Sequence, residues 1–388
     1  MSGKRDSGIL LSIFITIGLT ASVTVPLARA NDYISKPSEY PVLVPDTGQL
    51  RCYDNHKEIP CPGPDEPFYG QDGNYSINAP VYELKDQDGI ETVIDRTTGL
   101  RWQRRPDGAK RTWSEAIDYA DGLSLSGFTD WRLPEKHELQ SILSYGAIPS
   151  PLLKPVATTG SSIPPEGNTC AWTLTTRVFP SLYAKVLCLD DDQGKIRDKY
   201  EKNYVYAVRG PSLNYGKFQN NGNGTVTDQM TGLMWQAGEI RPEKWQQALT
   251  YCNQLDLGGY RDWRLPTIKE LSTLVNESRI NPAIDTTVFP GTRSGSYWSS
   301  TTFAKHPGFA WHVRFDNGLE YNGGYKGRRY FVRAVRGGEI AATAPPPSIL
   351  PGPAREEEEN GLENSPSPDR DNREMLEPYP LDPDAQYE

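Results

Sequence analysis

The sequence predicts two tandem copies of one α+β domain, because the same motifs occur twice in the same order. Residues 98–134 contain TGLRWQ and then DWRLP, and residues 231–266 contain TGLMWQ and then DWRLP, at an offset of 132 or 133 residues. A later set of matches, which includes AVRG at 207–210 and 334–337, has an offset of 126 or 127. Solenoid units repeat every 20–50 residues or about that, so this longer period indicates a complete domain with its own core.

The sequence of each copy predicts the same elements in the same order: a hairpin, two helices and a group of strands. In the second copy Asn223-Gly224 precedes Thr225–Asp228, which indicates a hairpin with glycine at a positive-φ turn position. Thr112 and Glu115 have capping-box spacing at the start of the first helix. The second helix follows Pro134, and the rest of the copy is strand-like and rich in aromatic residues. Two helices packed on a mainly antiparallel sheet are therefore expected in each copy.

The N-terminus predicts export. Lys4 and Arg5 precede an apolar run, and Ala28-Arg29-Ala30 follows it, which is the order of a secretory signal peptide cleaved after residue 30. An uncleaved anchor is the alternative, since the run is almost long enough to cross a bilayer. We expect a protein of the periplasm, cell surface or extracellular space, with no membrane span after cleavage.

The acidity of the whole chain belongs to its C-terminal segment. The net charge of the chain is −9, and residues 340–388 alone contain 12 acidic side chains, 3 basic side chains and ten prolines. Such a segment buries too little apolar surface to offset its ordering entropy, so we expect a disordered tail, either a spacer or interaction tail or a solvating terminus. The sequence predicts five segments in all: a signal peptide at 1–30, a disulfide-bonded segment at 31–79, the first repeat at 80–211, the second repeat at 212–338 and the tail at 339–388.

The five cysteines all follow the signal peptide and predict disulfides. Cys52 and Cys61 bracket a short polar loop and are expected to pair. Cys170 and Cys188 are both replaced in the second copy, so we expect them to bond to each other across neighbouring strands. Cys252 is left over and is either a reactive thiol or a core residue. Its helical spacing with apolar neighbours favours the core.

The complete motif order resembles the Lcl C-terminal domain family, named after a collagen-like bacterial adhesin. The second copy carries all of it: the opening hairpin at 224–235, DWRLP at 262–266, YWSST at 297–301 and VRAVRGG at 332–338. The first copy departs from the pattern at 171–175, where it has AWTLT. The resemblance implies a C-type-lectin-like fold and a distant likeness to formylglycine-generating enzymes.

The repeated DWRLP loops permit two interpretations. Arg132 and Arg264 can present a guanidinium to an anionic ligand, or they can bond to the neighbouring Asp130 and Asp262 or to backbone carbonyls and fix the entry to the second helix. We favour a scaffold, because the loop occurs in both copies beside core tryptophans. The residues assigned to this scaffold are Trp102, Trp131, Arg132, Trp235, Trp263 and Arg264.

No motif predicts catalysis, a metal or a cofactor. None of the histidines repeats between the copies, and His137 is expected at the surface. The polar residues between Asn221 and Asp228 are candidate calcium ligands, but they lack the pattern of the twelve-residue calcium loop, and an Asn-Gly turn explains them. A degenerate enzyme of the formylglycine-generating type is an alternative, although Cys252 alone cannot supply a pair of active-site cysteines.

Two basic clusters predict a surface for an anionic ligand, in a body whose net charge is only about −2. The alternative is a solvated face whose arginine stems cover aromatic rings. The resemblance favours an anionic or sulfated polysaccharide as ligand, in adhesion or envelope organisation, and we expect no nucleic-acid partner. A structural protein that uses the repeats as protein–protein surfaces, or a homo-oligomer, is the other hypothesis. The candidate binding residues are Arg104, Arg105, Lys110 and Arg111 in the first copy, and Tyr325, Lys326, Arg328, Arg329 and Arg333 in the second.

Overall fold

The computed structural model describes residues 42–87, 90–104, 106–146, 170–177, 180–189, 193–213, 215–238, 241–338 and 340–341. The predicted signal peptide, and the predicted tail from residue 342 onward, lie outside the described residues. The described residues, which include both repeats, all belong to one compact unit. No helix within the described ranges has the length and apolar character needed to span a bilayer.

The segment before the first repeat forms short strands. β1 (Cys52–Tyr53) and β2 (Glu58–Ile59) pair antiparallel, and the predicted Cys52–Cys61 disulfide is present beside this hairpin. A 3-10 turn at Asp72–Asn74 leads to β3 (Ser76–Ile77). β3 pairs with β18 (Ile340–Ala341), which lies in the predicted tail. Regular structure therefore extends past the boundary expected at residue 338, because this strand joins the N-terminal segment.

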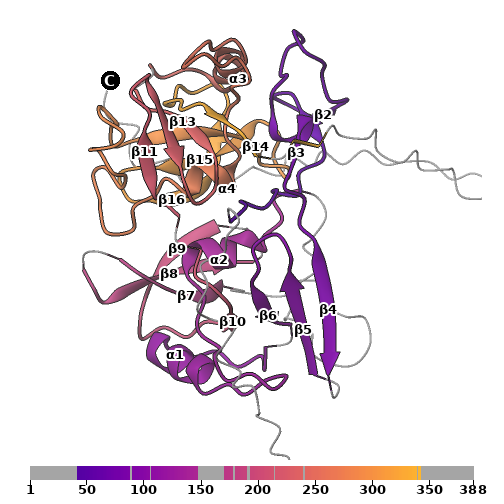
Figure 1. Ribbon diagram of the computed structural model, residues 1–388, viewed down its shortest axis with the longest axis vertical. Helices are drawn as coiled ribbons and strands as arrows, with labels where there is room; N and C mark the ends of the chain where they lie inside the picture. Colours follow the sequence, from indigo (N-terminus) through magenta and orange to yellow (C-terminus); the bar gives the residue numbers. More distant parts are fainter. Residues whose placement is uncertain are drawn as a thin grey trace, which may run out of the picture. The chain divides into compact units, whose positions relative to one another are not determined.

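The described part of the first repeat contains two sheets and two helices (Figure 1). The strand order is β10-β6-β5-β4 in the four-stranded sheet and β7-β8-β9 in the three-stranded sheet. The predicted Cys170–Cys188 disulfide joins directly opposed residues of β7 and β8. The elements are β4 (Tyr82–Gln87), β5 (Ile90–Asp95), β6 (Arg101–Gln103), α1 (Trp113–Asp121), α2 (Lys136–Ser141), β7 (Cys170–Thr176), β8 (Tyr183–Cys188), β9 (Gln193–Asp198) and β10 (Val208–Arg209).

The second repeat has the same architecture. Its strand orders are β11-β12-β13-β17 and β14-β15-β16, and neighbouring strands within these two sheets are antiparallel. The tandem α+β organisation is confirmed, but each copy divides its strands between two sheets where one was expected. The elements are β11 (Phe218–Asn220), β12 (Thr225–Asp228), β13 (Met234–Gln236), α3 (Trp245–Asn253), α4 (Ile268–Ser272), β14 (Ser296–Thr302), β15 (Phe309–Arg314), β16 (Leu319–Tyr325) and β17 (Val335–Arg336).

Local sequence signals set several of these boundaries. Thr112 caps α1 by accepting a hydrogen bond from the Glu115 N–H, and the Glu115 carboxylate accepts one from the Thr112 N–H, which confirms the predicted capping box. Gly224 and Gly232, at the two ends of the β12–β13 hairpin, have φ values of +82° and +72°. These angles lie in the region that glycine adopts without steric cost, as predicted for the turns.

The tryptophans fill the core of each repeat and bond in matched ways. Trp113 of α1 donates its indole N–H to Thr173 O at 2.9 Å, and Trp245 of α3 donates to Ser299 O at 2.8 Å. The two copies thus repeat at the level of single hydrogen bonds. The four tryptophans assigned to the scaffold from the sequence are all buried, namely Trp102, Trp131, Trp235 and Trp263.

Candidate ligand-binding surface

The arginine of each DWRLP loop forms a bidentate ion pair inside its own repeat. Arg264 donates to both carboxylate oxygens of Glu270 at 2.6 Å, and it also donates to Gly337 O at 3.1 Å. Arg132 and Glu138 repeat the pair at 2.7 and 2.6 Å. Each arginine therefore ties the second helix of its repeat to the closing strand. This arrangement fits the scaffold interpretation, but each arginine pairs with a glutamate of the second helix and not with the neighbouring aspartate.

The aspartate of each loop pairs instead with the last arginine of the repeat. Asp262 accepts hydrogen bonds from Arg336 at 2.7 and 3.0 Å, and the guanidinium lies 3.7 Å from the centre of the Tyr260 ring. Asp130 and Arg209 form the same pair at the same distances. Both charges of the motif are thus engaged within the fold, which leaves the loop poorly suited to hold a ligand.

Two residues of the predicted second-copy cluster are buried, which corrects that prediction. Lys326 is 3% exposed, donates to Asp54 O at 2.9 Å and lies 3.8 Å from the centre of the Trp245 ring. Burial lowers the pKa of Lys326 to about 7. Arg333 is also buried and donates to the carbonyl oxygens of Gln236 and Ala237. Neither side chain reaches the surface, so neither can meet a large external ligand.

The rest of that cluster gathers at one exposed end of the β15–β16 pair. Phe309 and Tyr325 are directly opposed in the two strands, 36% and 53% exposed, with ring centres 5.8 Å apart. A turn follows, in which the Arg328 N–H donates to Tyr325 O at 2.8 Å. Arg329 is exposed and donates to Glu243 at 3.1 Å. We call Phe309, Tyr325, Arg328 and Arg329 the β15–β16 tip.

Two further cations, not identified from the sequence, lie on loops beside this tip. A Cβ atom added to Gly308 would lie 3.0 Å from Asn55 O, so the β1–β2 turn packs against the residue that precedes Phe309. Lys57 lies on that turn, Lys305 lies on the loop that leads to Gly308, and both are exposed. Each is isolated in the sequence, and only the packing of the N-terminal segment brings their loops together.

The first-copy cluster is largely engaged within the fold. Arg111 pairs with Asp107, and its guanidinium lies 3.9 Å from the centre of a tyrosine ring. The exposed Lys110 places its ammonium 4.9 Å from another tyrosine ring. Arg104 is half-buried, and Arg105 lies outside the described residues. Lys110 and Arg111 therefore cover aromatic rings with their cationic side chains, which fits the alternative to a ligand site.

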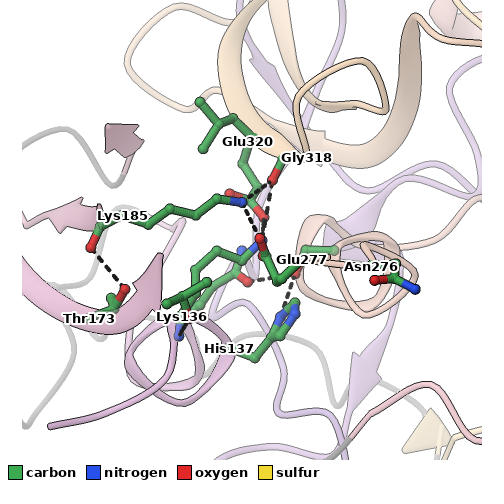
Figure 2. Close-up of polar contacts among 12 residues, drawn as sticks. Lys136, His137, Thr173, Lys185, Asn276, Glu277, Gly318 and Glu320 are labelled. Atoms are coloured by element: carbon green, nitrogen blue, oxygen red, sulfur yellow. Dashed lines mark hydrogen bonds and ion pairs between the residues drawn. The ribbon is translucent and has the colours of Figure 1, made fainter. Parts of the chain in front are cut away.

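A buried ion-pair network joins the two repeats (Figure 2). Lys136 lies 2.7 Å from Glu320 and 3.0 Å from Glu277, and Lys185 binds Glu277 and donates to Gly318 O at 3.0 Å. The lysines belong to the first repeat and the glutamates to the second. Figure 2 shows their side chains converging between the two ribbons. Two positive and two negative charges balance, so this cluster acts as a joint between the repeats.

The protonation states of the network fit this structural role. Burial alone would raise the pKa of Glu277, but Lys136 and Lys185 lower it to about 2. Burial and the neighbouring Lys136 lower the pKa of His137 to about 3, so this ring is neutral at pH 7. His137 is half-buried against Tyr215, with ring centres 5.6 Å apart, and not at the surface as expected.

The remaining polar candidates are used by the fold. Burial raises the pKa of the Cys252 thiol, which lies in the core as the helical spacing indicated. Asn221 donates to the hydroxyls of Thr225 and Thr227, and Asn223 accepts from Thr225, so these side chains stabilise the turn. Within the described ranges, no three or more His, Cys, Asp or Glu side chains are grouped as metal ligands.

The geometry defines a class of protein: a duplicated α+β domain with a shared internal scaffold and surfaces that differ between its copies. The family model of the Lcl C-terminal domain matches residues 91–209 and 224–336. The matched residues are more than half of the chain, so the chain belongs to the Lcl C-terminal domain family and contains two tandem copies of that domain. A comparison with curated proteins finds no match.

Proposed function

We propose that this chain is an exported, non-catalytic binding protein with C-type-lectin-like domains, related to the collagen-like adhesins, and that it binds an anionic polysaccharide. One observation carries the proposal: the exposed rings of Phe309 and Tyr325 lie beside Arg328 and Arg329 at the β15–β16 tip. Two disulfides fit an oxidising compartment outside the cytosol.

The tip offers the two kinds of contact that a sulfated sugar needs. The aromatic rings provide apolar faces against which the C–H groups of a sugar ring can pack. A guanidinium donates paired hydrogen bonds to sulfate or carboxylate oxygens. Arg329 already pairs with Glu243, but an exposed ion pair contributes only about 0–1 kcal/mol, so an anionic ligand can replace that partner.

The first-repeat counterpart of the tip has two carboxylates that the tip lacks, so we assign the proposed site to the second repeat. The strand register pairs Tyr183 with Asp198, where the second repeat pairs Phe309 with Tyr325. Glu201 stands at the position of Arg328. A carboxylate at both positions repels an anionic ligand, so the first-repeat counterpart of the tip is expected not to bind it.

Retention on immobilised heparin tests the proposal. We expect the full chain to bind at low salt and elute as salt rises, because exposed charges are screened. The Arg328→Ala/Arg329→Ala variant should lose most of this retention, and Tyr325→Ala should lose part of it. The matched control is Arg261→Ala/Arg279→Ala, which removes two exposed arginines elsewhere on the same repeat. Equal retention of the tip variant and the control would overturn the assignment.

We also propose that the protein has no catalytic activity. An active site of the formylglycine-generating type would need a pair of available thiols. Four cysteines are engaged in disulfides, and Cys252 is buried and alone. Incubation of the purified chain with model peptide and small-molecule substrates, with and without added metals, should produce no turnover, and reproducible turnover would contradict this proposal.

A further inference from the structure

The N-terminal segment covers one face of the second repeat. Trp245 is fully buried there, and the Phe68 ring lies 6.4 Å from the Trp245 ring. Lys326 lies over the same indole and donates to Asp54 O, so both a side chain and a backbone carbonyl of the N-terminal segment take part. This face is therefore a docking site that the chain fills with its own N-terminal segment.

The first repeat has the equivalent face in a more open state. The backbone N–H of Trp113 donates to Lys199 O at 2.9 Å, and the backbone N–H of Trp245 donates to Lys326 O at 3.2 Å. The ammonium of Lys199 lies 4.1 Å from the centre of the Trp113 ring, which repeats the second-repeat stacking. Trp113 and Lys199 are half-buried, however, whereas their second-repeat equivalents are buried.

Three positions around this face differ in size between the copies. The second repeat has small residues there, and a Cβ atom on Gly308 would lie 3.0 Å from Asn55 O, so small residues let the N-terminal segment approach. The first repeat has large apolar side chains that are 39%, 55% and 78% exposed. Leu174 is equivalent to Ser300, because their backbone N–H groups donate to Pro134 O and Pro266 O. Leu182 is equivalent to Gly308, because their carbonyls accept from the backbone N–H groups of Lys199 and Lys326. Tyr200 is equivalent to Gly327, because each directly follows one of those lysines.

Exposed apolar side chains gathered on one face of a protein mark an interaction site. We propose that the open first-repeat face is a dimer interface, which binds the same face of a second copy of this chain. The face is defined by Trp113, Leu174, Leu182, Lys199 and Tyr200. It is distinct from the β15–β16 tip, and the inference does not depend on glycan binding.

The charges around the face favour a second copy as the occupant. Glu115, Glu201 and the cation Lys202 are exposed at its rim, and the cation Lys199 is half-buried within it. A twofold axis brings a surface against itself, so each rim charge can meet one of opposite sign only when both signs are present. Three large side chains make a small contact area, so we expect a weak dimer whose population depends on protein concentration.

Sedimentation equilibrium of the full chain, from roughly 1 to 100 μM, tests this inference. We expect a monomer–dimer equilibrium in the wild-type chain. The variant Leu174→Ser/Leu182→Gly/Tyr200→Gly, which carries the second-repeat residues, should associate at least tenfold more weakly. Leu84→Ser removes an exposed leucine of β4 and serves as the control, which should dimerise like the wild type.

The single variant Tyr200→Glu keeps the test valid if the triple variant does not fold. It replaces an exposed apolar side chain of the contact with a charge that must be desolvated in the dimer, so it should also weaken the dimer at least tenfold, with an unchanged thermal midpoint. A wild-type chain that stays monomeric up to 100 μM or so would overturn the inference. Dimerisation of a folded variant with wild-type affinity would also overturn it.

Discussion

Replacing Glu320 with glutamine should weaken the joint between the repeats. Glu320 lies 2.7 Å from Lys136, and both side chains are 1% exposed. Removing one partner from a buried ion pair costs about 3–5 kcal/mol, because the other charge stays buried. Glu277 still lies 3.0 Å from Lys136, so we expect the lower value, about 3 kcal/mol. For a unit of this size, the melting temperature should fall by roughly 5–10 °C.

A double-mutant cycle in urea, followed by tryptophan fluorescence, measures this interaction directly. The cycle compares the wild type, Glu320→Gln, Lys136→Met and the double variant, and we expect a coupling energy of about 2 kcal/mol. The control is Glu58→Gln in the exposed Arg51–Glu58 pair, which should cost less than about 1 kcal/mol. Additivity within about 0.5 kcal/mol would refute the proposed interaction. A loss of stability from Glu320→Gln no larger than that of the control would refute it too.

Two further predictions concern buried titratable groups. Burial and then the neighbouring Asp46 raise the pKa of Asp72 to about 7, while the unfolded carboxyl ionises near pH 4. Between these pH values the folded chain keeps a proton on Asp72 that the unfolded chain loses, so the free energy of unfolding falls as pH rises, by at most about 1.4 kcal/mol per pH unit. Asp72→Asn should remove this slope in urea unfolding measured from about pH 4.5 to 7.5. An equal slope in the variant would contradict the assignment. Cys252 should not react with Ellman's reagent in the native chain but should react once per chain in urea without reductant; rapid native labelling would show that it is accessible.

The parts of the fold that the sequence predicted depend on local or paired signals. The Thr112–Glu115 capping box is a contact between near neighbours, so spacing alone predicts it. The Cys170–Cys188 disulfide was predicted because the second copy lacks both residues. The division into two sheets was not predicted, because alternation of apolar residues identifies a strand but not the strand beside it.

The candidate surface was only partly predictable, because burial there depends on a distant segment. The sequence places Lys326 beside Arg328 and Arg329 and so predicts a surface cation. In the structure Lys326 is buried, and its ammonium donates a hydrogen bond to Asp54 O of the N-terminal segment. That segment has no regular apolar pattern that would predict where it packs. The network of Lys136 and its glutamate partners was missed for the same reason, since its members come from separate parts of both repeats.

We propose that the shared residues of the two copies form the scaffold, while the surface that differs between them carries the binding function. Amide hydrogen exchange of the full chain, with and without a heparin oligosaccharide, tests this claim most directly. We predict slower exchange at residues 319–330 of the second repeat and no change at the equivalent residues 193–203 of the first. Unchanged exchange at 319–330, or protection confined to the two DWRLP loops, would contradict the claim.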